Sequence, residues 1–258
     1  MKYTQTNARM WDEANDSLAS KARVISQEAF LRAKAGELAL SLAGVEKAPA
    51  RWFPKLGGCR VLALAGGGGQ QGPVLAAHGA IVTVTDLSDR QLELERLAAK
   101  REGYAIETVK ADLAEPFPFE DGAFDLIVNP VSNCYIRELG PMWRECARVL
   151  RPGGVLMTGF CKEELFLFDP DFRREEVQIS RHPLPFDPLR DLTAEELAAR
   201  EKERRPLAFS HSLTEQLGGL LESGFTLTDL YEDRDGGGLI DRWMKAYVVV
   251  RAVKKEGA

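Results

Sequence analysis

The sequence predicts an α/β fold in which a parallel sheet is covered by helices on both faces. Short apolar runs alternate along the chain with segments whose apolar residues recur at helical spacing. Such alternation favours a parallel sheet, because consecutive parallel strands are joined by helices that cover the sheet. The run at 60–65 breaks into four consecutive glycines, which indicates a buried strand that meets a tight turn.

The predicted elements follow one another in a regular order. Predicted strands occupy 60–65, 81–85, 106–109, 124–128, 155–160, 225–231 and 244–253. Predicted helical segments occupy 8–45, 73–79, 88–101, 141–150 and 212–223, and Ser88 is placed to cap the third of them. Residues 161–208 are rich in charge, proline and phenylalanine, interrupt the order, and are interpreted as an insertion.

Composition excludes several classes of protein. The 258 residues carry a formal net charge of −5 and no basic stripe, so we expect no nucleic-acid partner. No apolar run reaches the roughly 18 residues of a membrane span, and the N-terminal residues lack the apolar core of a signal peptide. Four cysteines without C-x-x-C spacing and three histidines predict reduced thiols, no metal site and a cytoplasmic protein.

The glycine-rich turn is the main chemical motif. Glycine allows sharp turns and lets a ligand approach the bare backbone, so a nucleotide-type cofactor is expected at the end of the first strand. Asp86, about 20 residues beyond, is placed to accept hydrogen bonds from both ribose hydroxyls. The G-x-G-x-x-G spacing of Gly67, Gly69 and Gly72 also leaves a nicotinamide-dependent oxidoreductase open as the alternative function.

Later motifs separate these two classes. Lys110-Ala111-Asp112-Leu113 follows the third strand, Phe124-Asp125-Leu126-Ile127-Val128-Asn129-Pro130 forms the fourth, and Arg151-Pro152-Gly153-Gly154 precedes the fifth. Together with the glycine turn and Asp86, this ordered set resembles the class I S-adenosylmethionine-dependent methyltransferases over roughly residues 60–160. The sequence contains no Y-x-x-x-K pair for short-chain oxidoreductase chemistry.

The resemblance implies a Rossmann-like, doubly wound, mostly parallel sheet of seven strands with a final antiparallel strand. It also implies S-adenosyl-L-methionine as the cofactor. The cofactor-binding residues that it implies are Trp11, Ala65, Gly66, Gly67, Gly68, Gly69, Gln70, Asp86, Leu87, Gln91, Asp112, Leu113 and Asn129. The family commonly has an acid at or just before the first glycine, where this chain has Ala63 and Ala65.

A narrower resemblance concerns the acceptor. Asn129 to Tyr135, Trp143-Arg144-Glu145 and Phe209-Ser210-His211-Ser212 look like a group of bacterial small-molecule methyltransferases. The wider family resemblance implies an N-terminal helical cap over 1–50 and a methyltransferase domain over 51–258. Because residues 161–208 directly follow the fifth strand and differ in composition, we expect them to form a lid over the acceptor pocket.

The acceptor side is expected after the fourth strand. The substrate-binding residues expected there are Pro130, Ser132, Asn133, Tyr135 and Phe160. Tyr135 and His211 are the expected catalytic residues, with His211 as the candidate base. Because a sulfonium donor is already activated, we expect direct displacement catalysed mainly by positioning. The acceptor is a small molecule, and the protein is expected to be a monomer or a homodimer.

Overall fold

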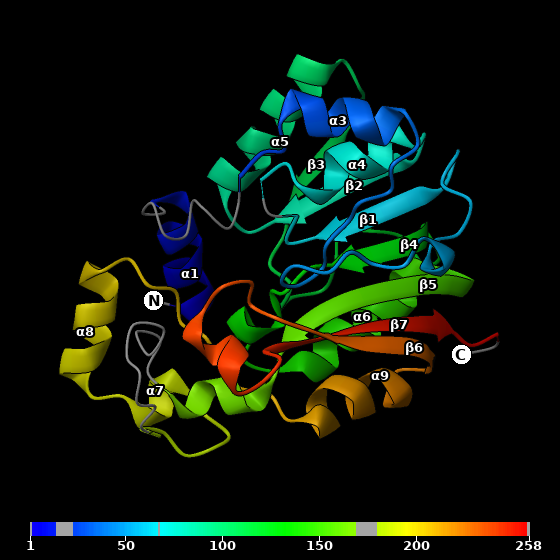
Figure 1. The fold of residues 1–258 in the computed structure, drawn as a ribbon. Coiled ribbons are helices and arrows are strands. Elements are labelled where there is room, and N and C mark those ends of the chain that lie inside the picture. The colour runs from blue at the N-terminus through cyan, green and yellow to red at the C-terminus, as the bar shows by residue number, and fades with distance from the viewer. Residues whose placement is uncertain (1, 14–22, 67, 169–179, 257–258) are drawn as a thin grey trace.

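A mixed sheet of seven strands forms the centre of the part of the chain that the structure describes (Figure 1). This computed structural model describes residues 2–13, 23–66, 68–168 and 180–256. The strands are β1 (Arg60–Leu64), β2 (Ile81–Asp86), β3 (Glu107–Lys110), β4 (Phe124–Asn129), β5 (Leu150–Cys161), β6 (Phe225–Asp233) and β7 (Tyr247–Lys254). Their order is β3-β2-β1-β4-β5-β7-β6, and β7 runs antiparallel to both of its neighbours. The predicted fold class is therefore confirmed.

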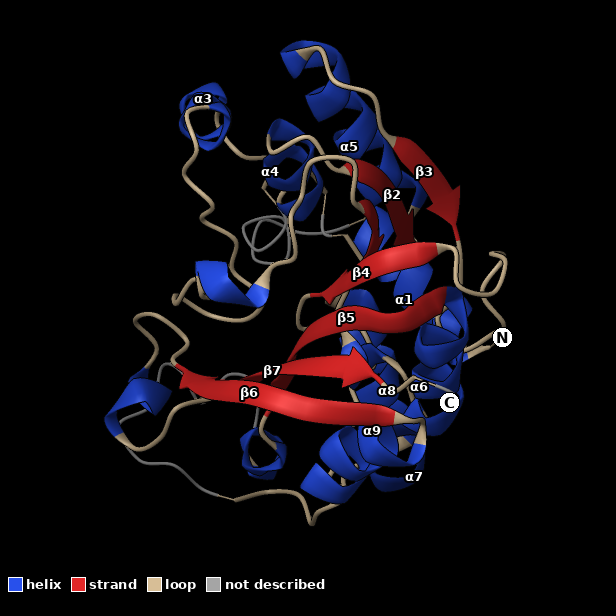
Figure 2. Cartoon of the chain, turned by 90° about the vertical axis from the view of Figure 1, so that its right-hand side faces the viewer, coloured by secondary structure: helices blue, strands red, loops and turns tan. Residues whose placement is uncertain are grey.

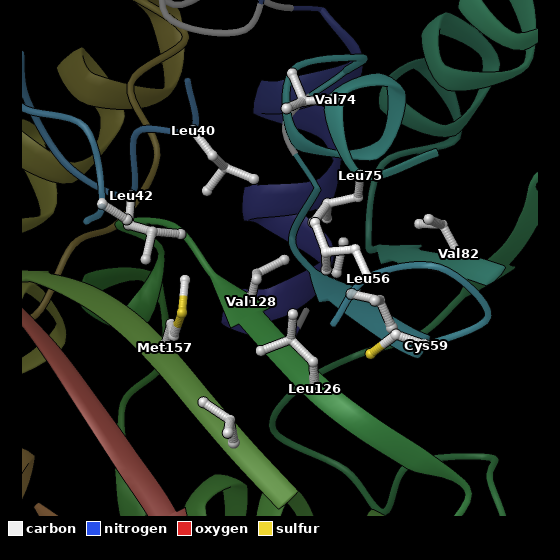
Figure 3. Close-up of a cluster of buried hydrophobic side chains, with 14 of the residues drawn as sticks. Leu40, Leu42, Leu56, Cys59, Val74, Leu75, Val82, Leu126, Val128 and Met157 are labelled. Carbon is white, nitrogen blue, oxygen red and sulfur yellow. The ribbon is translucent and has the colours of Figure 1, made fainter. Parts of the chain in front are cut away.

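Helices cover both faces of the sheet (Figure 2). The α-helices of the described residues are α1 (Tyr3–Asp12), α3 (Gln27–Lys34), α4 (Gln71–Ala77), α5 (Asp89–Glu102), α6 (Leu139–Val149), α7 (Pro188–Asp191), α8 (Ala194–Lys202) and α9 (Gly219–Glu222). Along β1, Val61 and Ala63 pack with α3, α4 and α5, whereas Leu62 and Leu64 pack with α6 and α9. This alternation of side chains is the period-2 pattern of a strand that is buried on both faces. Figure 3 shows part of the first of these two cores.

The prediction of a helix over residues 8–45 was largely wrong. Only α1 and α3 are helical in the described part of this region, and residues 37–49 run without a regular helix across the sheet. Leu40 and Leu42 are fully buried there, and the Leu42 carbonyl accepts a hydrogen bond from the Val131 amide at 2.9 Å. Gly159 on β5 permits this close approach, because a Cβ at that position would lie 2.1 Å from the Leu42 oxygen. Leu38, Leu40 and Leu42 recur at every second residue, so this part of the region lacks the helical spacing that extends to α3.

The predicted helix at 212–223 contains an irregularity. Residues Thr214–Gly218 form a π-helical turn that leads into α9. At the junction, a Cβ on Gly219 would lie 2.7 Å from Cδ1 of Trp143, so glycine lets α9 approach α6 closely. The Trp143 indole nitrogen donates to the Glu215 carbonyl at 3.2 Å, which satisfies one carbonyl in the wide turn.

The insertion and the N-terminal helix meet at one edge of the sheet. Beyond the carboxyl ends of the parallel strands, Figure 1 shows α1, α7 and α8 close together. A short 3₁₀ helix, Glu163–Leu167, follows β5, and Phe168 forms an isolated antiparallel bridge with Ser180. This edge is where ligands bind in open parallel sheets.

Candidate active site

A large cavity opens at the carboxyl edge of the parallel strands. Its volume is about 1250 Å³, which exceeds the ~300–1,000 Å³ that is typical of a site for one small ligand. Its walls come from the glycine loop, the ends of β2, β3 and β4, the N-terminal segment and the insertion. One cavity therefore has room for two ligands side by side.

The glycine loop between β1 and α4 forms one end of the cavity. Gly68 and Gly69 have φ values of 70° and 92°, which suit glycine, and Ala65 has a φ of 44° although it carries a Cβ. A Cβ on Gly66 would lie 2.3 Å from Cγ1 of Val84, so the loop packs tightly against β2. Of the predicted loop residues, Ala65 and Gln70 line the cavity. Gly66, Gly68 and Gly69 form the turn but are not among the lining residues, and Gly67 lies outside the described residues.

Two acids follow neighbouring strands on the same side of the cavity. Asp86 ends β2 and accepts a hydrogen bond from the Ser88 amide at 2.9 Å, and Asp112 follows β3 and accepts from the Ala114 amide at 3.0 Å. Both acids line the cavity together with Leu87, Gln91 and Leu113. The structure thus brings the predicted acids, the apolar residue after Asp112 and the glycine loop to one region.

An aromatic pair joins α1 to the loop that follows β4. The rings of Trp11 and Tyr135 meet edge to face, with centroids 5.6 Å apart, and both side chains line the cavity. Pro130 and Ser132 lie on the same wall, in the loop that follows β4. Of the predicted acceptor-side residues, these two and Tyr135 reach the cavity.

A buried polar network supports that loop from behind. Asn129 donates to Asn133 at 2.6 Å and to Thr158 at 3.0 Å, and it accepts from the Ser132 hydroxyl at 2.8 Å. Asn133 in turn donates to Gln216 at 3.0 Å. Asn129 and Asn133 are fully buried and do not line the cavity. Their hydrogen bonds hold the loop that follows β4 in place.

Phe160 and His211 are further predicted site residues that do not line the cavity. Phe160 is buried on β5 against Val248 and Val250 of β7. His211 is buried, and its Nε2 donates to the Ile136 carbonyl at 2.7 Å. Neither residue lines the cavity, so the structure does not bring the predicted base to the acceptor side.

Several cavity residues were missed by the sequence reasoning. The insertion contributes Phe166 and Phe186, whose rings are 6.3 Å apart, and His182, whose ring lies 4.5 Å from that of Phe186. Gln71 and Asn7 also line the cavity. The abundance of phenylalanine in the insertion is the sequence signal for these residues. Asn7 had no signal, because its partners are about 130 and 200 residues away along the chain.

Helix α1 is fastened over the cavity by polar contacts. The buried Asn7 accepts from the Leu207 amide at 2.7 Å and donates to the carbonyls of Leu207 at 3.0 Å and Tyr135 at 3.4 Å. At the end of the helix, Asp12 accepts from the Ser88 hydroxyl at 2.6 Å. These bonds join α1 to the end of the insertion, to the loop after β4 and to the start of α5.

Neither a membrane helix nor a metal cluster occurs in the described parts of the chain. No helix there is long and apolar enough to cross a bilayer. Within the same residues, no group of three or more histidine, cysteine, aspartate or glutamate side chains is arranged to hold a metal ion.

The chain is similar in sequence to proteins named as methyltransferases. Residues 62–158 match the family model described as a methyltransferase domain. The chain is 37% identical over 248 residues to the Bacillus subtilis (strain 168) protein named "Uncharacterized methyltransferase YbaJ", covering 96% of this chain and 97% of that protein.

Solved structures share the fold at lower identity. A Mesorhizobium loti S-adenosylmethionine-dependent methyltransferase is 20% identical, with a TM-score of 0.59 over 79% of this chain and 94% of that one. The geranyl diphosphate C-methyltransferase of Streptomyces coelicolor A3(2), solved with Mg²⁺, geranyl diphosphate and S-adenosyl-L-homocysteine, is 15% identical. Its TM-score is 0.58 over 98% of each chain.

Proposed function

Because the chain belongs to the class I S-adenosylmethionine-dependent methyltransferases, we propose that it methylates a small molecule inside the cavity at the carboxyl edge of its sheet. The main support for this proposal is a single cavity of about 1250 Å³ that is lined both by the glycine loop and by the insertion. A nucleic-acid substrate would favour an open basic surface, whereas this chain has a net charge of −5.

The cofactor is assigned to the half of the cavity that the glycine loop forms. The left-handed backbone at Gly68 and Gly69 gives a cradle without side chains, and Asp86 and Asp112 stand at the ends of the next two strands. Asp86 is assigned to the ribose hydroxyls, and Asp112 with Leu113 to the adenine. Bound S-adenosylmethionine supplies an activated methyl group on a sulfonium centre.

The acceptor is assigned to the other half of the cavity. Trp11 and Tyr135 are assigned to the boundary between the two halves, and Phe166 and Phe186 of the insertion to the wall of the acceptor half, since all four side chains line the cavity. Tyr135 and Ser132 offer hydroxyls that can orient a polar group of the acceptor. Alignment of donor and acceptor can supply about 7–11 kcal/mol of the barrier, so a fixed aromatic wall has a direct catalytic value.

The insertion is assigned the role of a roof over the acceptor. Its described residues contribute a long series of cavity-lining side chains, namely Leu165, Phe166, Phe168, His182, Phe186, Arg200, Glu203, Arg204, Arg205, Pro206 and Ala208. An insertion at this edge can exclude water and select substrates by size. The Streptomyces coelicolor neighbour acts on geranyl diphosphate, a small molecule, which supports the same type of acceptor for this chain.

The oxidoreductase alternative has no support. Both the family model and the full-length relative are methyltransferases, and the solved neighbours named above are as well. The glycine spacing that kept this alternative open is common to both classes of enzyme.

Transfer of a labelled methyl group tests the proposed acceptor class. The purified protein is incubated with methyl-labelled S-adenosylmethionine and an extract of the source organism that has been separated by size into small molecules, proteins and nucleic acids. We expect label in the small-molecule fraction, and much less of it with the Asp86→Ala variant. Label confined to protein or nucleic acid would contradict the proposal.

A further inference from the structure

Glu95 supports the glycine loop from α5 and does not itself line the cavity. It lies on α5 and is fully buried, and its Oε1 accepts a hydrogen bond from the Gly69 amide at 2.6 Å. A Cβ on Gly72 would lie 2.7 Å from its Oε2, so the same carboxyl also packs against the start of α4. Ala63 and Ala65 offer no polar group from the strand side. The carboxyl of Glu95 therefore contacts both the glycine loop and the start of the helix that follows it.

The surroundings of Glu95 favour its uncharged form. The charged or titratable groups that act on it are Asp86, at the end of β2, and Tyr104, beyond the end of α5. Burial is the largest effect on this carboxyl and the like charge of Asp86 adds to it, so the pKa of Glu95 rises to about 8 even though the Gly69 amide opposes the rise. Glu95 thus keeps its proton at neutral pH.

Buried acceptors without a partner occur on Glu95 itself and on two glutamines that are close to Glu95 or Gly72 along the chain. Gln91 is one turn earlier on the same helix, and Gln71 immediately precedes Gly72. The side-chain oxygens of both glutamines are buried and have no hydrogen-bond partner among the described residues, and the same is true of Glu95 Oε2. A carboxylic acid provides one O–H donor to such surroundings, whereas a carboxylate provides none.

We propose that Glu95 is a positioning residue that holds the cofactor loop in its binding conformation as a neutral carboxylic acid. This inference rests on the assignment of the cofactor to the glycine loop. Loss of the proton places a second negative charge beside Asp86 in a buried layer, where no water solvates it. The buried charge then displaces the loop toward solvent, and cofactor affinity falls.

The direction of the pH effect follows from linkage. The native state holds a proton on Glu95 that the unfolded chain releases above its own pKa, near the ordinary value of 4.5. The contribution of Glu95 to stability is therefore full below pH 4.5 and is lost as the pH rises through about 8. Because the proposal requires a protonated Glu95 in the cofactor-bound state, cofactor affinity falls by up to tenfold for each pH unit above the pKa of about 8.

Calorimetric titration with S-adenosylhomocysteine between pH 6.5 and 9.5 tests the proposal, with wild type compared to Glu95→Gln and Glu95→Ala. Glutamine keeps an acceptor for the Gly69 amide and cannot ionise. We expect Glu95→Gln to bind as tightly as wild type at pH 7 and severalfold more tightly at pH 9.5, and Glu95→Ala to bind more weakly throughout. Because the ligand's own amino group also titrates, the compared quantity is the affinity ratio of wild type to Glu95→Gln at each pH.

Controls separate this inference from the proposed function. Glu93→Gln changes an exposed acid on the same helix and should follow the wild-type profile. A constant ratio of wild type to Glu95→Gln, or equal weakening by glutamine and alanine, would overturn the role of the proton. If wild type fails to bind S-adenosylhomocysteine at every pH, the proposed function itself fails. Thermal unfolding at each pH verifies that the variants are folded, and Glu95→Gln should gain stability relative to wild type as the pH rises.

Discussion

Replacement of Asn7 tests whether α1 is a fixed wall of the active site. In Asn7→Ala, the amide and carbonyl of Leu207 lose their side-chain partners, and Leu207 is only 7% exposed. A buried backbone group without a partner costs about 1–3 kcal/mol. Two such groups, partly relieved by local rearrangement, predict a loss of about 2–4 kcal/mol of unfolding free energy. This is a large part of the ~5–15 kcal/mol that is typical of folded domains.

Urea denaturation and titration with S-adenosylhomocysteine measure the two consequences of this change. We expect the denaturation midpoint to fall, and the affinity to fall with it, because Trp11 loses its position against Tyr135. Gln5→Ala removes only a bond at the exposed start of the same helix, to the Lys2 amide, and should cost less than about 1 kcal/mol. An Asn7→Ala variant as stable as Gln5→Ala would refute the view that this side chain fastens the helix.

Three further substitutions test particular features of the fold and the site. Gly159→Ala should lose about 1–3 kcal/mol of unfolding free energy, because its Cβ would lie 2.1 Å from the Leu42 oxygen. Urea denaturation measures this loss, and Gly57→Ala is the matched control because its Cβ would have no neighbour within 4 Å. Ala65→Gly should gain about 1 kcal/mol in the same assay because it relieves a positive φ of 44°, and a loss would show that this backbone carries no strain. His211→Gln should keep most of the methyl-transfer rate, because the glutamine amide can still donate to the Ile136 carbonyl and residue 211 does not line the cavity. Loss of methyl transfer in a folded His211→Gln variant would instead support the prediction that His211 is the base.

The parts of the fold that follow local patterns were predictable from the sequence. The strands of the sheet have alternating or continuous apolar residues, and Ser88 caps α5 by accepting a hydrogen bond from the Gln91 amide as expected. Asp86 and Asp112 reach the cavity because a parallel sheet brings the ends of neighbouring strands together. For such residues, position along a strand is enough to predict position in the site.

The remaining features depend on contacts between distant parts of the chain. Residues 37–45 belong to the region predicted to be helical, but Leu40 and Leu42 are buried against the sheet in a segment without a regular helix. Asn129 and Asn133 face each other behind the loop, because β5 and the π-helical turn supply partners for them there. No local pattern distinguishes an asparagine that faces a ligand from one that supports the backbone beside it.

Calorimetric titration of wild type and Asp86→Ala with S-adenosylhomocysteine tests the assignment of the site most directly, with NAD as the comparison ligand. Removal of the Asp86 carboxylate takes a charged partner from the ribose hydroxyls, at a cost of about 1.5–3 kcal/mol. We predict saturable binding of S-adenosylhomocysteine to wild type, binding weakened tenfold or more in Asp86→Ala, and no saturable binding of NAD. Equal affinity of the two proteins for S-adenosylhomocysteine, or saturable binding of NAD alone, would contradict the account.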